Sequence, residues 1–366
     1  MTAPDEVPTE VGSGANSGAR AEHSRRANAE ERAGERRERC SDAARLRGDP
    51  LIGTAPPATR WLLVEQDGGW GREALTSLDA PASVRSHLER ALSESGARLQ
   101  LVRRPGRRSP VEAAGPRRWF VVDVHPAGVV ADGTLDEGWA AVTSALHTPP
   151  AELPAVEAEQ ACPPADNIRR GLSGGLGPAR EAAPARRFIL VCTNGRHDVC
   201  CAVRGRPVAA ALATMWPDDV WECTHTGGDR FAGNVVVLPD GVVYGSLDPG
   251  SAMTVIDAHS AGRLTCGVLG DHLRGFVGFR ATEQAARAAL APRLAELDVT
   301  PWERERLRVE NARDGSGWIC KATLDGAPFA TVTGHDEIRP AQHLTCSATA
   351  VSRARVPVVD AVKTAR

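Results

Sequence analysis

Residues 188–207, FILVCTNGRHDVCCAVRGRP, decide the fold of this chain. The apolar run 188–192 predicts a buried strand, and residues 201–215 predict a helix. A short polar loop joins the two. A strand that runs through a loop into a helix indicates an α/β fold, in which sites lie at the carboxyl ends of the strands. We therefore expect a functional site where residue 192 ends the strand.

The segment that follows continues the same pattern. Strands are expected over 220–225, 234–238 and 242–247, and helices over 251–262 and 282–297. Pro239-Asp240-Gly241 joins two of these strands and is a strong hairpin signal. The order strand, helix, strand, hairpin, helix is typical of a thioredoxin-like α/β unit. We predict such a lobe over 187–300.

The part of the chain before this lobe predicts a second α/β lobe over 40–147. Its expected elements are strands over 60–65, 98–103 and 119–124, a helix over 82–95 that stops at Gly96, and a later helix opened by Thr134 and Glu137 in capping-box spacing. The strand openings RWLLVE, RWFVVD and RFILVC are alike. This likeness suggests an internal duplication as a hypothesis, although buried α/β strands generally look this way.

The remaining segments carry weaker signals. Residues 1–39 are polar and nearly free of large apolar side chains, which predicts a disordered tail. Residues 148–186 repeat Pro, Gly, Ala and Glu and predict a linker that contains Cys162. Asp-Gly pairs at 314–315 and 325–326 separate short strands, so 301–366 predicts a small β appendage and a C-terminal tail.

Composition bounds the function. The chain has 366 residues and a net charge of −2, so no overall field favours nucleic acid or an anionic membrane. We find neither a spanning segment nor a secretory leader, and expect a cytoplasmic protein. Nine cysteines in a reducing compartment favour metal or redox chemistry over disulfides. Three of them lie in apolar or strand-like runs and are expected to be buried small hydrophobic residues: Cys266, Cys320 and Cys346.

Two motifs carry the candidate chemistry. Cys192 ends one strand, and Cys200 and Cys201 begin the following helix, where unpaired N–H groups stabilise thiolate. His225 ends another strand and precedes Gly-Gly and then Asp229. Glycines allow the close approach of backbone to a bulky group. Together the motifs predict one metal site.

Residues 188–207 and VWECTHTGGDRFAGNVVVLPDGVVYG, with the opening CSDAARLRGDPLIGTAPPATRWLLVE, resemble the sucrase/ferredoxin-like family over roughly 40–350. The resemblance implies a thioredoxin-like fold and a [2Fe–2S] cluster. Two cysteines separated by eight intervening residues would be ligands, which here are Cys192 and Cys201 rather than Cys200. Relatives supply two histidines in a His-x-Gly-Gly-His motif. His225 matches the first of them, whereas Asp229 stands at the second.

The departure at position 229 leaves the fourth ligand open. Asp229 ranks first, although carboxylate is a less usual iron ligand than imidazole or thiolate. Cys223 ranks second because it lies two residues before His225 on the expected strand, and Cys200 ranks third. Loss of the cluster in this branch is the remaining alternative.

The leading hypothesis is an electron carrier or redox sensor that works with an unidentified redox partner protein rather than converting a substrate. A thiol redox enzyme can use the same residues, but the missing Cys-x-x-Cys motif counts against it. A structural zinc module can use the same Cys and His ligands. Glycoside hydrolysis needs two positioned carboxylates, which no spacing indicates. Four arginines around the motifs can offset cluster charge, dock an acidic partner, or simply be solvated: Arg196, Arg204, Arg206 and Arg230.

Overall fold

The computed structural model describes residues 38–106, 115–124, 127–149, 186–262, 270–314 and 317–365. The chain divides into two units, residues 1–39 and 40–366, and all elements named below belong to the second. Nearly all of the expected tail and linker, together with Cys162 and Cys266, lies outside the described residues. No helix in the described part is long and apolar enough to cross a membrane.

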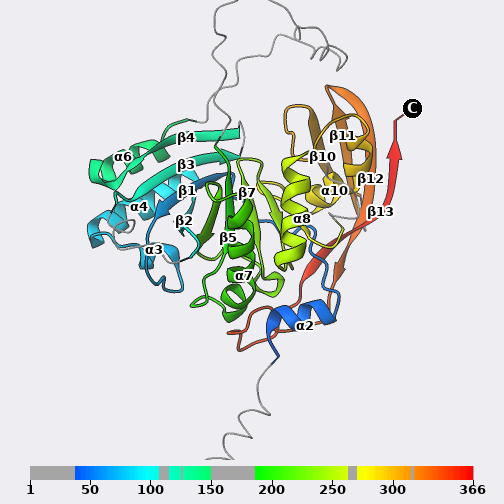
Figure 1. Ribbon diagram of the computed structural model, residues 1–366. Helices are drawn as coiled ribbons and strands as arrows, with labels where there is room; N and C mark the ends of the chain where they lie inside the picture. Colours follow the sequence, from blue (N-terminus) through cyan, green and yellow to red (C-terminus); the bar gives the residue numbers. More distant parts are fainter. Residues whose placement is uncertain are drawn as a thin grey trace, which may run out of the picture. The chain divides into compact units, whose positions relative to one another are not determined.

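The larger of two sheets has nine strands in the order β4-β3-β1-β2-β6-β5-β7-β8-β9 (Figure 1). Its first four strands come from the N-terminal half: β1 (Arg60–Glu65), β2 (Arg98–Arg103), β3 (Arg118–Val124) and β4 (Ala127–Thr134). The other five follow: β5 (Phe188–Cys192), β6 (Val220–Cys223), β7 (Val235–Leu238), β8 (Val242–Tyr244) and β9 (Leu273–Phe276).

The strand order is repeated on the two sides of the β2–β6 pair. In the first half β1 pairs parallel with β2 and antiparallel with β3, which pairs antiparallel with β4. In the second half β5 pairs parallel with β6 and antiparallel with β7, which pairs antiparallel with β8. The sheet is therefore continuous across both expected lobes.

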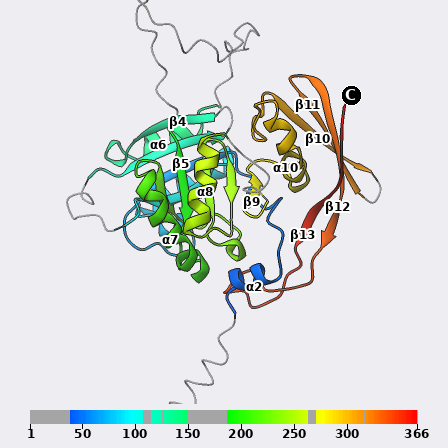
Figure 2. The same ribbon diagram turned by 45° about the vertical axis from the view of Figure 1, so that its right-hand side comes forward.

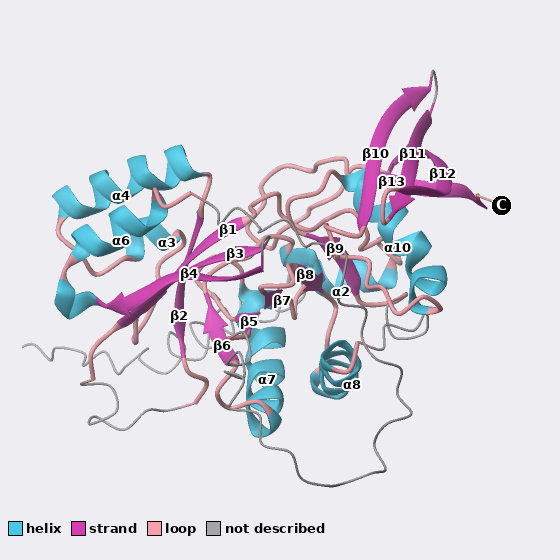
Figure 3. Ribbon diagram, turned by 90° about the horizontal axis from the view of Figure 1, so that it is seen from above, coloured by secondary structure: helices cyan, strands magenta, loops and turns pink. Residues whose placement is uncertain are grey.

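Helices cover the two halves on opposite faces of this sheet (Figure 3). The N-terminal half has α3 (Ala74–Ser77), α4 (Ala82–Ser95) and α6 (Trp139–Leu146). The other half has α7 (Val199–Met215) and α8 (Pro249–Ser260). On α4 the buried residues are Leu88 and Ala91, which follow the helical repeat and pack on β1. Gly96 ends this helix with φ 66°.

One apolar cluster contains residues of both halves and joins them. It combines Trp61 and Leu63 of β1 with Phe188, Leu190 and Cys192 of β5. The alternate residues of β5, Ile189 and Val191, pack in the cluster beneath α7 and α8. This alternation is the two-residue period of a strand that is buried on both faces. The sheet curls so that Cys192 faces the core that the two halves share.

The second sheet is antiparallel, in the order β10-β11-β12-β13. Its strands are β10 (Leu307–Asp314), β11 (Gly317–Leu324), β12 (Ala327–Ile338) and β13 (Arg355–Thr364). The helix α10 (Ala281–Ala295) packs against it through Leu290 and Leu294. This sheet is the expected β appendage, with Asp325-Gly326 joining β11 to β12.

Two expectations about individual elements are wrong. Thr134 does not cap a helix: it is the last residue of β4, pairs with Arg118, and makes no side-chain cap. After a short 3-10 turn, α6 begins at Trp139 behind Gly138, whose φ is 90°. The strand expected to reach His225 ends at Cys223. His225 therefore lies in the turn beyond the strand.

Candidate metal centre

Cys192 and Cys201 meet because a strand and the following helix pack very closely. Cys192 is the last residue of β5, and Asp198 caps α7 by accepting a hydrogen bond from the Cys200 N–H. One turn along the helix, a Cβ at Gly205 would lie 2.0 Å from the carbonyl oxygen of Cys192. Only glycine allows this approach. Gly205 therefore lets the start of α7 reach the end of β5.

The turn after β6 is held on several sides. Gly227 and Gly228 have φ of 94° and 76°, and a Cβ at Gly228 would lie 2.5 Å from Nη2 of Arg274. The guanidinium of Arg274, which is fully buried, donates to the Gly227 carbonyl at 2.8 Å, and Asn234 donates to the Gly228 carbonyl at 2.9 Å. The glycines thus leave room for the Arg274 guanidinium, which holds the backbone between His225 and Asp229 in place.

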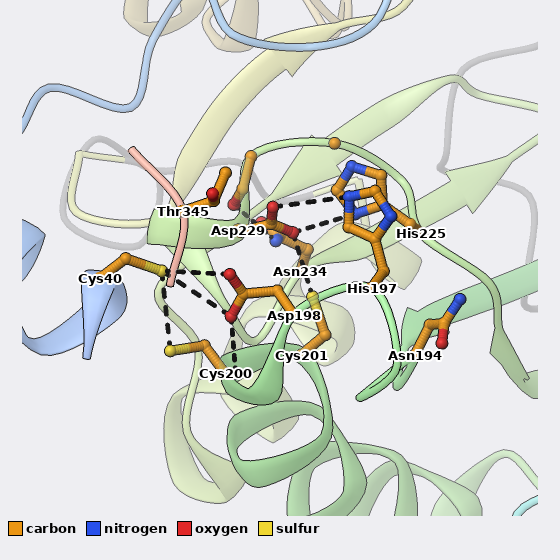
Figure 4. Close-up of polar contacts among 12 residues, drawn as sticks. Cys40, Asn194, His197, Asp198, Cys200, Cys201, His225, Asp229, Asn234 and Thr345 are labelled. Carbon is orange, nitrogen blue, oxygen red and sulfur yellow. Dashed lines mark hydrogen bonds and ion pairs between the residues drawn. The ribbon is translucent and has the colours of Figure 1, made fainter. Parts of the chain in front are cut away.

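Two overlapping groups of donor atoms form the candidate site. The possible ligand atoms of Cys192, Cys201 and His225 lie within 4.8 Å of one another, and so do those of His197, His225 and Asp229. Asp229 links the groups, because its Oδ1 lies 3.3 Å from Sγ of Cys201 and 3.0 Å from Nδ1 of His225 (Figure 4). All four expected ligands are therefore brought together.

His197 is the member of the site that sequence reasoning missed. Its ring stacks on that of His225, with centroids 3.6 Å apart and planes 12° apart. Its Nδ1 lies 3.1 Å from the Arg72 carbonyl, and its Nε2 lies 3.7 Å from Oδ2 of Asp229. The signal was weak: a histidine in the loop between the two cysteines, four residues before Cys201.

The two thiols of the site are coupled through a hydrogen bond. A hydrogen bond from Cys201, aided by His225, holds the pKa of Cys192 well below its usual range despite burial. The same hydrogen bond, together with burial, raises the pKa of the Cys201 thiol. A metal that binds both sulfurs would replace the proton of that hydrogen bond and remove the like-charge repulsion between the thiolates.

The histidine and the carboxylate support each other electrostatically. Burial alone would lower the pKa of His225, but Asp229 and the Cys192 sulfur outweigh it and raise that pKa to about 9. Burial alone would raise the pKa of Asp229, but His225 and His197 outweigh it and lower that pKa. Nδ1 of His225 is buried and faces the Asp229 carboxylate at 3.0 Å. Two sulfurs, an imidazole and a carboxylate gathered in this way are donor types that iron–sulfur and zinc sites use.

The site is closed on its sulfur side and open on its histidine side. Cys192, Cys201 and Asp229 are buried. The side chains of His197 and His225 are 16% and 21% exposed. Exchange with solvent or with another molecule would therefore take place at the imidazole edge.

The two alternative fourth ligands lie elsewhere. Cys223 pairs with Cys192 across β5 and β6 and is buried in the shared apolar core, which raises the pKa of its thiol. Cys200 lies with Cys40, Cys346 and Asp198 in another group of possible donors. Among the described residues, neither cysteine belongs to the groups around His225.

Two of the four arginines that flank the motifs form ion pairs with other residues of the chain. Arg204 forms an ion pair with Asp42, and Nε of Arg230 lies 3.6 Å from Asp49. Arg196 and Arg206 are exposed.

Comparison with known proteins identifies the family. A family model described as sucrase/ferredoxin-like matches residues 51–275, more than half of the chain. The chain belongs to the sucrase/ferredoxin-like family. The match spans the strands of the large sheet and all of the site around Cys192 and His225, and it excludes the second sheet. No curated protein and no solved structure matches the chain.

Proposed function

We propose that this sucrase/ferredoxin-like protein holds a [2Fe–2S] cluster and serves as a cytoplasmic electron carrier or redox sensor. Cys192 and Cys201 would bind one iron, and His225 with Asp229 or His197 would bind the other. The observation that carries the proposal is the convergence of two buried sulfurs with an imidazole edge in the family-defining segment. Two thiolates opposite imidazole are a known arrangement for such clusters.

The fourth ligand is the open part of this set. Oδ1 of Asp229 contacts both Cys201 and His225, which supports Asp229 as a direct ligand. His197 has its Nδ1 on the Arg72 carbonyl, and its Nε2 faces the site, 3.7 Å from Oδ2 of Asp229. Such an outer hydrogen bond is usual for a ligating histidine. If His197 binds the iron, Asp229 orients the two imidazoles. If Asp229 binds the iron, His197 shields the carboxylate from solvent.

When bound, the cluster would supply reversible one-electron chemistry. The chain contributes the surroundings. Buried Cys192 and Cys201 exclude water from the sulfur side, while the partly exposed ring of His225 offers the route to a partner. An imidazole with a titrating N–H can hold or release a proton as the charge of the site changes. Arg196, which is exposed and directly precedes His197 in the chain, supports an acidic partner.

A thiol redox enzyme is the second candidate, and the lowered pKa of Cys192 favours it. Burial of both sulfurs counts against it, because a disulfide substrate could not reach Cys192 or Cys201. We therefore rank it below the electron carrier.

We further propose that each half of the large sheet is a thioredoxin-like unit and that the halves arose by duplication. Two observations support this: the repeated strand order on each side of the β2–β6 pair, and the placement in both halves of a long helix between the parallel strands, α4 or α7, and of another helix after the hairpin, α6 or α8.

Anaerobic purification with absorbance and with iron and sulfide analysis tests the cluster. We expect a coloured protein with about two irons and two sulfides per chain. Cys201→Ala should lose both, whereas Cys320→Ala, a buried cysteine of the second sheet, should keep both. A colourless wild-type protein with zinc bound through Cys201 would overturn the cluster in favour of a zinc module.

A further inference from the structure

A second group of metal-binding side chains lies beside the first and is made from different residues. Its possible donors are Cys40, Asp198, Cys200 and Cys346, whose ligand atoms lie within 4.8 Å of one another. Cys40 begins α2 (Cys40–Leu46), Cys200 lies in the first turn of α7, and Cys346 lies between β12 and β13. Three segments far apart in the sequence therefore meet at one point.

The three sulfurs form a nearly equilateral triangle. The Sγ–Sγ distances are 3.7 Å for Cys40 and Cys200, 3.4 Å for Cys200 and Cys346, and 3.6 Å for Cys346 and Cys40. A tetrahedral zinc site with Zn–S bonds of about 2.3 Å has sulfurs about 3.8 Å apart. The triangle therefore has the size that one tetrahedral ion needs, and all three cysteines are free.

Asp198 completes the fourth corner. Its Oδ1 and Oδ2 lie 3.9 and 3.8 Å from Sγ of Cys40. Each oxygen already accepts one backbone N–H, from Cys200 at 2.9 Å and from Cys346 at 2.7 Å. A carboxylate oxygen accepts more than one bond, so these contacts orient Asp198 and leave lone pairs for a cation. Figure 4 shows Asp198 beside Cys40 and Cys200, and facing away from the two histidines.

The surroundings fit a structural ion. Cys40, Cys200 and Asp198 are buried, and Cys346 is partly exposed. Cys40 and Cys200 also interact electrostatically with Arg230 and Arg45, respectively, which offsets the negative charge of three thiolates and a carboxylate. In Figures 1 and 2 the segment between β12 and β13 runs beside α2. An ion here would fasten both segments to the start of α7.

We propose that Cys40, Cys200, Cys346 and Asp198 bind one zinc ion in a closed, structural site. The sulfurs are too close together to bind three different irons of a larger cluster, whereas zinc takes three thiolates and a carboxylate without redox chemistry. This site does not depend on the proposed [2Fe–2S] function. Cys200 and Cys201 are adjacent on α7 and point to different groups of donors, and Cys40 and Cys346 lie outside the family match.

The test measures zinc, iron and sulfide together in the full chain, purified without chelator and then exposed to Zn²⁺ alone followed by desalting. The wild type should retain about one zinc per chain. Cys40→Ser, Cys200→Ser and Cys346→Ser should each reduce zinc at least tenfold. Cys201→Ala should keep zinc while losing any iron, and Cys320→Ser should keep both as the matched control. Circular dichroism confirms that each variant is folded.

Asp198→Asn separates the metal role from the helix cap, because asparagine also caps helices well. It should weaken zinc binding while α7 stays intact. Replacement of zinc by Co²⁺ should give the intense absorption of a tetrahedral cobalt thiolate, which Cys346→Ser changes. A folded wild type that retains no zinc, or zinc that survives in all three serine variants, overturns the proposal. Zinc lost with Cys201→Ala but kept in Cys200→Ser would assign the ion to the first site and overturn it equally.

Discussion

The two halves of the large sheet share a strand order but differ in the residues at the strand ends. At the end of β5, Cys192 pairs with Cys223 of the parallel neighbour. At the corresponding place in the first half, Glu65 ends β1 and pairs with Val102. Glu65 is buried and forms an ion pair with Arg118 at 3.2 Å. One framework position thus holds a structural ion pair in one half and a candidate metal ligand in the other. Function follows the site residues rather than the strand order.

The connections that follow the first strand differ too. In the second half six residues, 193–198, connect β5 to α7. In the first half the longer segment 66–81, which includes the short helix α3, connects β1 to α4. The longer connection reaches across to the site, where the carbonyls of Gly71 and Arg72 contact Asn194 and His197. The N-terminal half therefore acts as a scaffold that positions the loop between Cys192 and Cys201.

The largest expected difference between the halves is at these equivalent positions. Cys192→Ala should abolish cluster binding, because thiolates hold most of its binding energy. Glu65→Ala should keep the cluster and cost roughly 1 kcal/mol, since its partner Arg118 is partly exposed. Iron content and thermal unfolding of both variants measure this. Equal iron loss in the two would show that β1 contributes more than a scaffold.

The second prediction concerns the ligand that the first half orients. His225→Ala should lose the cluster or change its spectrum strongly. Asp229→Ala and His197→Ala then identify the fourth ligand, because only the true ligand should change the spectrum and the stability of the cluster together. Electron paramagnetic resonance of the reduced protein gives the comparison. Cys223→Ser serves as the control, and a change in this variant alone would place the ligand outside this set.

Much of this comparison could be predicted from the sequence, because it depends on local signals. The helix 82–95 has the expected bounds since Gly96 stops it, and the hairpin at Pro239–Gly241 forms as expected. The strand β4, AGVVADGT, was missed because glycines and a mid-strand aspartate hide its pattern. Its partner β3 supplies the pairing that the segment itself does not indicate.

The sites were harder, since tertiary packing makes them. Nothing local indicates that His197 stacks on a ring in another loop. Cys346 was expected to be an ordinary core residue, yet its sulfur meets that of Cys40, 306 residues away in the chain. Cys192, Cys201 and His225 could be found because each lies at or just beyond the end of a strand or in the first turn of a helix, where the α/β pattern itself places a site.

A third prediction separates stability from chemistry within the first half. Arg60 and Asp123 form a buried pair with two contacts of 2.7 Å, and Arg60 also donates to the Leu146 carbonyl. Asp123→Ala would leave the guanidinium buried and unpaired, which costs about 3–5 kcal/mol. We expect a lower midpoint in urea with unchanged metal content below the transition. Loss of metal at denaturant concentrations where the protein is folded would mean that the halves are coupled more tightly than a scaffold requires.

The smallest expected effect on metal binding lies at the seam between the halves, where β2 pairs with β6. Arg98 and Gln100 of β2 donate to the His225 carbonyl at 2.9 and 3.2 Å, so two residues of the first half fix a candidate ligand of the second. Groups that orient a ligand typically contribute about 10–100-fold to metal affinity. Arg98→Leu should weaken metal affinity by about 10-fold, because Gln100 keeps one of the two hydrogen bonds. Arg98→Leu combined with Gln100→Leu should weaken it by about 100-fold. Release of iron to a chelator measures the affinity. Arg187→Leu is the matched control, since Arg187 precedes β5 at the end away from Cys192 and pairs with Asp219. If the double variant and Arg187→Leu release iron equally fast, the seam joins the halves without orienting His225.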